Sequence, residues 1–588
     1  MVQAYDSLVD VLDERAEQQR DQVAFSFLAA NGRPALSLTY EELHARARHI
    51  AHTLYAYGAS AGDRAILVFP PGLDFIAAFF GCLTAGVIAV PLAPPRRVAG
   101  RDAAANIIAD CDPRFGLTTA AYAADLAGRG VGSLTSRDLT WVYVDEELQR
   151  PAIEQPETCR PARSNLAFLQ YTSGSTSAPK GVMVSHGNLL ENLDMIRRAL
   201  GHSRSSKHVC WMPLHHDMGL ILNVLEAFYL GAGCVLMAPV AFLQRPLTLL
   251  KAVGELGAEV AGGPNFGFDL CVTRFRPEEM RGVDLSGWRV AINGAEPVRA
   301  QTLRKFAATF EPYGFKPSAF NPCYGMAEAT LLISGGKRGA GAAVRAVDRA
   351  GLQAGRVATA RPDSDAATIV GCGKALEREQ IAIVDPETRR RLAIDCIGEI
   401  WVRGPHVAGG YWRNPVASDE TFAGQIDGEA GAAWLRTGDL GFMNSDGELF
   451  VTGRIKDLII VRGANHYPQD IEHTAQAADP CLRAGYGAAF AALASSGDER
   501  VVIVQEVERC HRARIDVTAI AEQIREAVVE EHGLAVLDVV LLEPGTIPKT
   551  TSGKIRRRVA KQLWETGELT RMAVTGRRPL SAKASIQP

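Results

Sequence analysis

Short apolar runs alternate with segments of helical period through about the first 450 residues of the chain. The runs at 166–171 (LAFLQY) and 288–293 (WRVAIN) each have the length of one buried strand. In the segment 189–200, leucine and isoleucine recur every three or four residues, which places them on one face of a helix. This alternation predicts an α/β fold in which helices cover mainly parallel strands.

Residues 65–95 carry one charged side chain, Asp74, and are long enough to cross a bilayer as a helix. Prolines and glycines divide this segment into AILVFP, DFIAAFFGCLTAG and VIAVPLAPP. Because proline interrupts regular structure, the pattern favours strand, helix and strand over a single membrane helix. We therefore expect a buried β-α-β unit and no membrane span.

The pattern changes after residues 451–463, where the chain becomes a compact mixture of short elements. The predicted strands and helix of this part are at 499–507, 517–533 and 534–542, followed by a basic terminal helix. A chain of 588 residues is long enough for more than one domain. We expect a large N-terminal domain at 1–455, a small α+β domain at 456–588, and a flexible tail from about residue 571.

Composition and charge narrow the classes of function. Hydrophobic residues make up 47% of the chain and charged residues 22%, as in globular proteins. The formal net charge of −3 creates no overall field that attracts nucleic acid or anionic lipid, so any phosphate recognition must be local. The eleven cysteines include no close pair, and the N-terminus lacks the features of an export signal. We expect a cytoplasmic protein with reduced thiols.

The strongest local signal for chemistry is YTSGSTSAPKG at 171–181. Glycine lets the backbone approach an anion, hydroxyl and amide groups donate hydrogen bonds to phosphate oxygens, and Lys180 adds a positive charge. The string is not a Walker loop, because Pro179 precedes the lysine and Gly181 follows it. The pattern therefore indicates a phosphate-binding loop, with a flexible surface loop as the alternative.

Six further motifs follow this loop along the chain. They are WMPLHHDMGL (211–220), NGAEP (293–297), NPCYGMAEAT (321–330), RTGDL (436–440), GRIKDLIIVRGANHYPQDIE (453–472) and PKTTSGKIRR (548–557). Together with the loop, they resemble the adenylate-forming superfamily of acyl-CoA synthetases, adenylation domains and luciferases, and within it the fatty acyl-AMP ligase branch. The resemblance runs from about Ser7 to Leu563.

This resemblance implies a fold and a reaction. The fold has a large N-terminal domain of layered α/β subdomains and a small mobile C-terminal domain. The reaction joins a medium- or long-chain fatty acid to ATP, with Mg²⁺, to give an acyl-adenylate and pyrophosphate. The acyl group then passes to the phosphopantetheine thiol of a separate acyl carrier protein, and the enzyme is expected to be a monomer.

The resemblance also implies roles for individual residues. The β- and γ-phosphates would be held by Thr172, Ser173, Gly174, Ser175, Thr176 and Lys180. The adenylate part would lie against Gly294, Ala295, Glu296, Tyr324, Gly325, Met326, Asp439 and Arg454. The metal ligand would be Glu328, the catalytic residues Lys554 and His216, and the hinge of the mobile domain Lys456 and Asp457.

Each of these roles has a structural alternative. Asp439 could form an Asx turn, and Glu328 could be a charge that the first turn of a helix favours. Lys554 could belong to a solvated basic helix start, and His216 could be a packed core histidine. The cluster of His208, His215, His216 and Asp217 could also be read as metal ligands, but the sequence has no HExxH motif and no thiolate at ligand spacing, so zinc is not expected.

The acceptor of the acyl group depends on a long segment after Glu328. Residues 344–368 resemble the insertion of acyl-AMP ligases, which implies that they hinder the domain rotation used with CoA; a long polar surface loop is the alternative. An acyl-CoA synthetase and an amino-acid-activating domain therefore remain open, as does an inactive nucleotide-binding scaffold. Against the scaffold, Lys180, Glu328, Asp439, Arg454 and Lys554 are all present.

Overall fold

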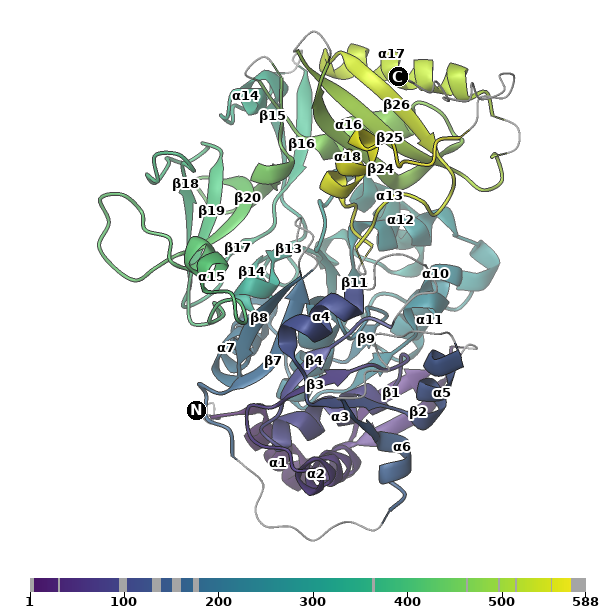
Figure 1. The fold of residues 1–588 in the computed structure, drawn as a ribbon. Coiled ribbons are helices and arrows are strands. Elements are labelled where there is room, and N and C mark those ends of the chain that lie inside the picture. Colours follow the sequence, from purple (N-terminus) through teal and green to yellow (C-terminus); the bar gives the residue numbers. More distant parts are fainter. Residues whose placement is uncertain are drawn as a thin grey trace, which may run out of the picture. The chain divides into compact units, whose positions relative to one another are not determined.

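A computed structural model shows how the chain folds (Figure 1). It describes residues 5–29, 32–94, 103–128, 139–150, 160–172, 179–361, 365–461, 464–494, 498–512, 515–550 and 553–572. The chain divides into two compact units, Met1–Thr452 and Gly453–Pro588. This division falls just before the predicted hinge at Lys456 and Asp457.

The first unit contains a nine-stranded sheet in the order β17-β14-β13-β12-β11-β9-β10-β1-β2. Its strands are β1 (Val23–Leu28), β2 (Pro34–Thr39), β9 (His208–Cys210), β10 (Cys234–Leu236), β11 (Val260–Gly263), β12 (Val290–Asn293), β13 (Phe320–Gly325), β14 (Leu332–Gly335) and β17 (Lys374–Ala375). The neighbours from β13 through β1 are parallel, so the carboxyl ends of these strands share one edge. That edge is where α/β proteins bind ligands.

A six-stranded sheet in the order β6-β5-β3-β4-β7-β8 forms a second layer of the same unit. Its strands are β3 (Arg64–Leu67), β4 (Ile88–Pro91), β5 (Phe115–Thr118), β6 (Thr140–Tyr143), β7 (Leu166–Thr172) and β8 (Lys180–Ser185). The parallel strands β3 and β4 are joined by the buried helix α3 (Asp74–Thr84), which confirms the predicted β-α-β unit. Among the described residues, no helix is long and apolar enough to cross a membrane.

Two smaller sheets complete the strands of this unit. The four-stranded sheet contains β18 (Gln380–Val384), β19 (Gly398–Arg403), β20 (Leu435–Met443) and β21 (Leu449–Arg454). Within the predicted insertion, β15 (Val344–Asp348) pairs antiparallel with β16 (Ala366–Val370). The insertion is attached to the first unit itself, since Arg345 forms an ion pair with Asp395 and Val357 donates to the Asp395 carbonyl.

The sequence supplies side-chain caps at the start of several helices of the first unit, among them α1 (Leu8–Gln18), α2 (Tyr40–Ala56) and α7 (His186–Leu200). In α7, the Ser185 hydroxyl accepts from the Asn188 amide, and Gly201 ends the helix in the left-handed conformation. The other described helices are α4 (Ala103–Cys111), α5 (Ala120–Gly128), α6 (Val144–Glu147), α8 (Asp217–Gly219), α9 (Glu226–Leu230), α10 (Pro239–Gln244), α11 (Leu247–Glu255), α12 (Asn265–Thr273), α13 (Ala300–Phe310), α14 (Arg349–Gln353) and α15 (Pro415–Phe422).

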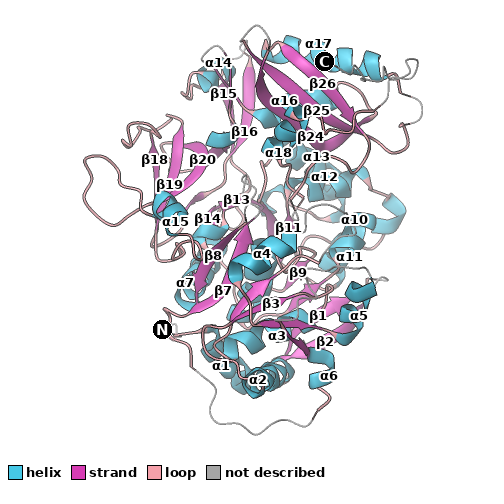
Figure 2. Cartoon of the chain, viewed as in Figure 1, coloured by secondary structure: helices cyan, strands magenta, loops and turns pink. Residues whose placement is uncertain are grey.

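The second unit is a small mixture of strands and helices (Figure 2). Its elements are β22 (Ile459–Val461), β23 (Ala464–His466), α16 (Pro468–Ala477), β24 (Leu482–Leu493), β25 (Glu499–Val507), α17 (Val517–His532), β26 (Val536–Leu542) and α18 (Arg557–Glu565). Apolar residues of α16 and α17 pack with β24, β25 and β26 in one core. The strands and helices predicted after residue 498 are therefore confirmed, as is the α/β class of the chain.

Candidate active site

Most predicted site residues of the first unit follow strands of the nine-stranded sheet at their carboxyl ends. His216 lies in the turn after β9, the segment 294–296 follows β12, and Tyr324 is near the end of β13. Glu328 lies on a 3-10 turn, Ala327–Ala329, directly after β13. Because these strands are parallel neighbours, the fold brings the four groups to one edge of the sheet.

The predicted phosphate loop joins two antiparallel strands of the six-stranded sheet. Thr172 ends β7 and pairs with Lys180, the first residue of β8. The residues between them that we predicted to bind phosphate, Ser173, Gly174, Ser175 and Thr176, lie outside the described residues. The Lys180 ammonium is 4.5 Å from the centre of the Tyr411 ring, within the range of a cation–π contact.

Glu328 is 8% exposed and is held by a segment far along the chain. The Tyr411 hydroxyl donates to Glu328 Oε1 at 2.7 Å, and the Ala408 amide donates to the Glu328 carbonyl at 2.9 Å. Sequence reasoning missed Tyr411. The available signal was an aromatic residue directly after Gly409 and Gly410, and this signal alone does not point to Glu328.

The predicted adenine and ribose residues are in direct contact. The Tyr324 hydroxyl donates to Asp439 Oδ2 at 2.8 Å, which links β13 of the nine-stranded sheet to β20 of the four-stranded sheet. Asp439 is buried and follows Gly438, whose φ of +70° lies in the left-handed region. The contact places an aromatic ring and a carboxylate side by side, which is an arrangement suited to a base and a ribose.

Residues 294–296, which we predicted to form one wall of the adenine site, lie close to the end of β13. A Cβ atom added at Gly294 would lie 2.8 Å from Cys323 Sγ, so only glycine fits there. Burial raises the pKa of the Cys323 thiol to about 12, which keeps it neutral. The carboxylate of Glu296 has a second task, because its Oε1 accepts from the Phe266 amide at 2.6 Å near the start of α12.

His216 lies in the turn that starts α8. The Met218 amide is shared between His216 Nδ1 at 3.2 Å and Asp217 Oδ1 at 2.7 Å. The Gln170 amide group donates to the His215 carbonyl at 3.1 Å, which ties this turn to β7. His216 therefore caps a helix next to the strand that leads into the phosphate loop.

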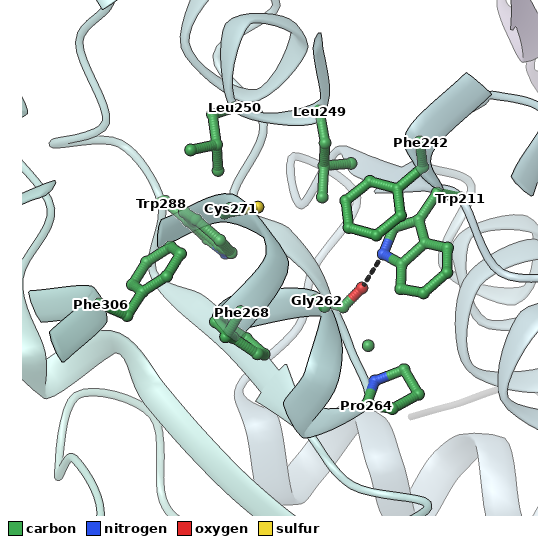
Figure 3. A pocket seen from close by; sticks show the side chains of 12 residues that line it. Trp211, Phe242, Leu249, Leu250, Gly262, Pro264, Phe268, Cys271, Trp288 and Phe306 are labelled. Carbon is green, nitrogen blue, oxygen red and sulfur yellow. Dashed lines mark hydrogen bonds between the residues drawn. The ribbon is translucent and has the colours of Figure 1, made fainter. Parts of the chain in front are cut away.

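A narrow apolar pocket with a cavity volume of about 10 Å³ lies at the ends of β9 and β11 (Figure 3). Trp211 and Phe242 stack at one end with ring centres 3.9 Å apart, and Trp288 and Phe306 lie at the other end. Sequence reasoning did not predict this pocket. The glycines of 262–267 were its only signal.

Two of those glycines open the pocket by lacking a side chain. A Cβ atom at Gly263 would lie 2.7 Å from the Trp211 ring, and one at Gly267 would lie 3.1 Å from it. The Trp211 ring is fixed by its Nε1 group, which donates to the Gly262 carbonyl at 2.8 Å. The width of the pocket therefore depends on these glycines.

In the second unit, Lys554 lies on a tight turn before α18. The Thr550 amide donates to the Lys554 carbonyl at 2.8 Å, and the Lys554 amide donates to the Thr550 hydroxyl at 2.9 Å. The turn passes through Gly553, whose φ of +92° favours glycine. Lys549 anchors the same turn, because its ammonium donates to the Gly485 carbonyl at 3.2 Å.

The predicted hinge residues lie at the start of this unit. Arg454 is exposed at the end of β21, and Lys456 is exposed on the 3-10 turn that follows. Asp457 accepts from Arg557 at 3.1 Å, and Arg557 also binds the buried Glu472. Although burial alone would lower the pKa of Arg557, these two carboxylates raise it. The rotation about Lys456 and Asp457 stays a prediction.

The fold and the comparison with known proteins together identify the chain as an adenylate-forming enzyme. The model of the AMP-binding enzyme family matches residues 12–412, and that of the Disco-interacting protein 2-like AMP domain matches 456–574. The chain belongs to the AMP-binding enzyme family. This confirms the resemblance drawn from the motifs.

Several relatives match nearly the whole chain. It is 40% identical over 582 residues to the medium-chain-fatty-acid–acyl-carrier-protein ligase JamA of Moorena producens, with 96% of each chain covered. It is 36% identical to the long-chain-fatty-acid–AMP ligase FadD26 of Mycobacterium marinum, covering 97% of this chain and 99% of the relative. The crystal structure of fatty acid AMP ligase from Legionella pneumophila matches with a TM-score of 0.73 and 40% identity, covering 96% and 97%.

Proposed function

We propose that this protein is a fatty acid–AMP ligase that uses ATP and supplies a separate acyl carrier protein. The observation that carries the proposal is the apolar pocket at the ends of β9 and β11, beside the strand ends that bear the predicted nucleotide residues. An alkyl chain would enter this apolar site by moving its side chains apart, and JamA and FadD26 are named for fatty-acid ligation. The ten described cysteines are all free, which supports a cytoplasmic location. The proposal also has the protein acting as a monomer.

The reaction brings two anions together, so its main demands are placement and charge neutralisation. A carboxylate oxygen of the fatty acid attacks the α-phosphorus of ATP. The bond from this phosphorus to the bridging oxygen breaks, and pyrophosphate leaves with the electron pair. Lys554 would contact the carboxylate and the α-phosphate, and His216 would lie near the carboxylate.

The other predicted residues would bind the nucleotide. Tyr324 would stack on adenine against the wall 294–296, together with Gly325 and Met326, and Asp439 would accept from the two ribose hydroxyls. Arg454 would reach the ribose or the phosphate. Thr172 and Lys180, with the intervening loop residues, would donate to the β- and γ-phosphates.

Glu328 fits the part of a Mg²⁺ ligand. Mg²⁺ is usually held by one or two carboxylates plus substrate phosphates, and a buried carboxylate beside the phosphate strand meets that need. Among the described residues, no three His, Cys, Asp or Glu side chains form a metal cage, which is in keeping with a shared site of this kind. When bound, Mg²⁺ would neutralise charge on the phosphates.

The insertion, residues 344–368, would bias the acceptor towards a carrier protein. Its attachment to the first unit through Arg345 and Asp395 supports a fixed obstacle rather than a free loop. If it disfavours the thiol-accepting arrangement by ~3 kcal/mol, under about one per cent of molecules adopt that arrangement. The binding energy of CoA would not offset this free-energy difference, whereas a carrier protein adds the binding energy of its surface.

The test is to incubate the protein with ATP, Mg²⁺ and a series of fatty acids, alone, with CoA, or with a phosphopantetheinylated carrier protein, and to resolve the products. We expect acyl-AMP in every case, acyl transfer to the carrier protein, and little acyl-CoA. If acyl-CoA forms as fast as acyl-AMP, the protein is an acyl-CoA synthetase. If no acid leads to pyrophosphate release, the protein is an inactive nucleotide-binding scaffold. Deleting 344–368 should preserve acyl-AMP formation and raise acyl-CoA.

A further inference from the structure

The segment 404–412 lies between β19 and α15. It forms hydrogen bonds both to β8, which begins at Lys180, and to the turn that carries Glu328. Along β8, the Met183 amide donates to the Gly410 carbonyl at 2.9 Å and the Trp412 amide donates to the Gly181 carbonyl at 2.7 Å. Towards the turn, the Ala408 amide donates to the Glu328 carbonyl. The backbone of one segment thus contacts both parts of the predicted phosphate and metal site.

Tyr411 is the side chain of this segment that touches the charged group of each part. Its hydroxyl donates to Glu328 Oε1 at 2.7 Å, while its ring faces the Lys180 ammonium at 4.5 Å. The ring itself is fixed, because Tyr411 is 5% exposed and packs edge-on against Phe422. One buried phenol therefore contacts both a carboxylate that follows the nine-stranded sheet and an ammonium on the six-stranded sheet.

The turn is also held from its other side. Thr330 has a φ of +64°, which is strained for a β-branched residue, and its hydroxyl donates to the His406 carbonyl at 2.6 Å. The His406 ring lies 3.0 Å from Glu379, and both side chains are fully buried. A strained backbone fastened at a functional position is expected where the geometry of a nearby group matters.

We propose that Tyr411 is a positioning residue that orients Glu328 for the metal and Lys180 for the phosphates of ATP. The inference rests on the roles of Glu328 and Lys180 in the proposed function. A hydrogen bond to a ligating carboxylate fixes its orientation and strengthens metal binding. A phenol carries no charge at neutral pH. Tyr411 therefore forms no ion pair with Glu328 or Lys180 that the metal or the phosphates would have to break.

Two substitutions separate the two contacts. Tyr411→Phe removes the hydroxyl and keeps the ring beside Lys180, whereas Tyr411→Leu removes both. Tyr5→Phe is the matched control, because the Tyr5 hydroxyl also donates to a glutamate, Glu14, at 2.8 Å but lies outside the site. All variants are compared with Glu328→Gln, and their thermal unfolding is measured first without metal.

Metal binding is measured directly as Mn²⁺ binding, by electron paramagnetic resonance, to the full chain with a non-hydrolysable ATP analogue. We expect Tyr411→Phe to weaken Mn²⁺ binding about 10- to 100-fold, the range for losing a group that supports a metal ligand. Its rate of acyl-AMP formation at saturating Mg²⁺ should return close to that of the unaltered protein. Tyr411→Leu should in addition bind the ATP analogue in EDTA roughly two- to fivefold more weakly, as one lost cation–π contact implies.

The outcomes distinguish this inference from the proposed function. Unchanged Mn²⁺ affinity in Tyr411→Phe, with a clear loss in Glu328→Gln, would overturn the role of Tyr411 and leave Glu328 in place. A rate that stays low at every Mg²⁺ concentration would also overturn it, because a purely structural defect is not corrected by metal. If Glu328→Gln keeps its Mn²⁺ affinity, the metal role in the proposed function fails, and this inference fails with it.

Discussion

Replacing Gly267 with leucine should shorten the fatty acid that the enzyme prefers. Gly267 lies on α12 and faces the Trp211 end of the pocket, where an added Cβ atom would be 3.1 Å from Trp211 and 3.5 Å from Phe242. Its backbone is in an ordinary helical conformation, so the substitution acts through the space it fills. Gly267 lines the pocket, so the isobutyl group of leucine would take up space beside the Trp211 and Phe242 rings.

The magnitude follows from the methylenes that the chain can no longer bury. If the leucine side chain displaces about three methylenes at ~0.8 kcal/mol each, the enzyme loses ~2.4 kcal/mol of binding to its longest good substrate, roughly 60-fold in kcat/KM. Gly267→Ala adds one carbon and should cost about fourfold. Acids short enough to end before the new side chain should keep their kcat/KM.

The assay is pyrophosphate release with a series of saturated fatty acids of increasing length. Gly128→Leu is the matched control, since Gly128 also lies on a helix, α5, and an added Cβ there would meet nothing within 4 Å. Equal losses for short and long acids in Gly267→Leu would refute the pocket as the chain site. So would an unchanged preference for the longest acids.

Three other substitutions test the second unit and the stability of the first. Lys554→Ala should slow acyl-AMP formation by about 10²-fold while use of preformed acyl-AMP suffers less, and normal acyl-AMP formation would remove Lys554 from this step. Arg557→Gln leaves two acidic partners without their cation and should lower the free energy of unfolding by about 3 kcal/mol in urea titrations; an unchanged midpoint would contradict the buried ion pair. Burial lowers the pKa of His186 to about 4. The unfolded chain therefore binds a proton that the folded chain does not, and stability falls by about 3 kcal/mol as the pH drops from 6.5 to 4. His186→Asn should reduce that slope, and urea titrations across this range measure it.

Local features of the sequence account for the parts of the fold that were predictable. The β3, α3 and β4 unit follows from prolines and glycines that divide one apolar run, and the helix α17 follows from its apolar period. Both signals act over a few residues. The strands β7 and β8 were also predictable from local sequence, because a string rich in glycine and hydroxyl residues separates their two apolar runs.

The site was less predictable because its contacts join distant positions. Tyr411 and Glu328 are 83 residues apart, and nothing at either position indicates the other. The bond between Glu296 and the Phe266 amide spans 30 residues, so the carboxylate assigned to the adenine wall has a structural task that its own motif does not reveal. The pocket depends on missing side chains, and a glycine in a sequence does not say what its absent Cβ would have touched.

The helix α12 connects the two halves of the proposed substrate site. Its second residue, Phe266, is bound by Glu296 of the adenine wall, and its third, Gly267, forms part of the acyl pocket beside Trp211. A shift of the wall therefore moves the pocket, whereas a side chain added at 267 narrows the pocket without touching the wall. Substitutions at Glu296 should consequently change ATP affinity and chain preference together, and substitutions at Gly267 should change chain preference alone. The two outcomes differ because the hydrogen bond from the Phe266 amide to Glu296 links the wall to α12, whereas Gly267 lies on the pocket side.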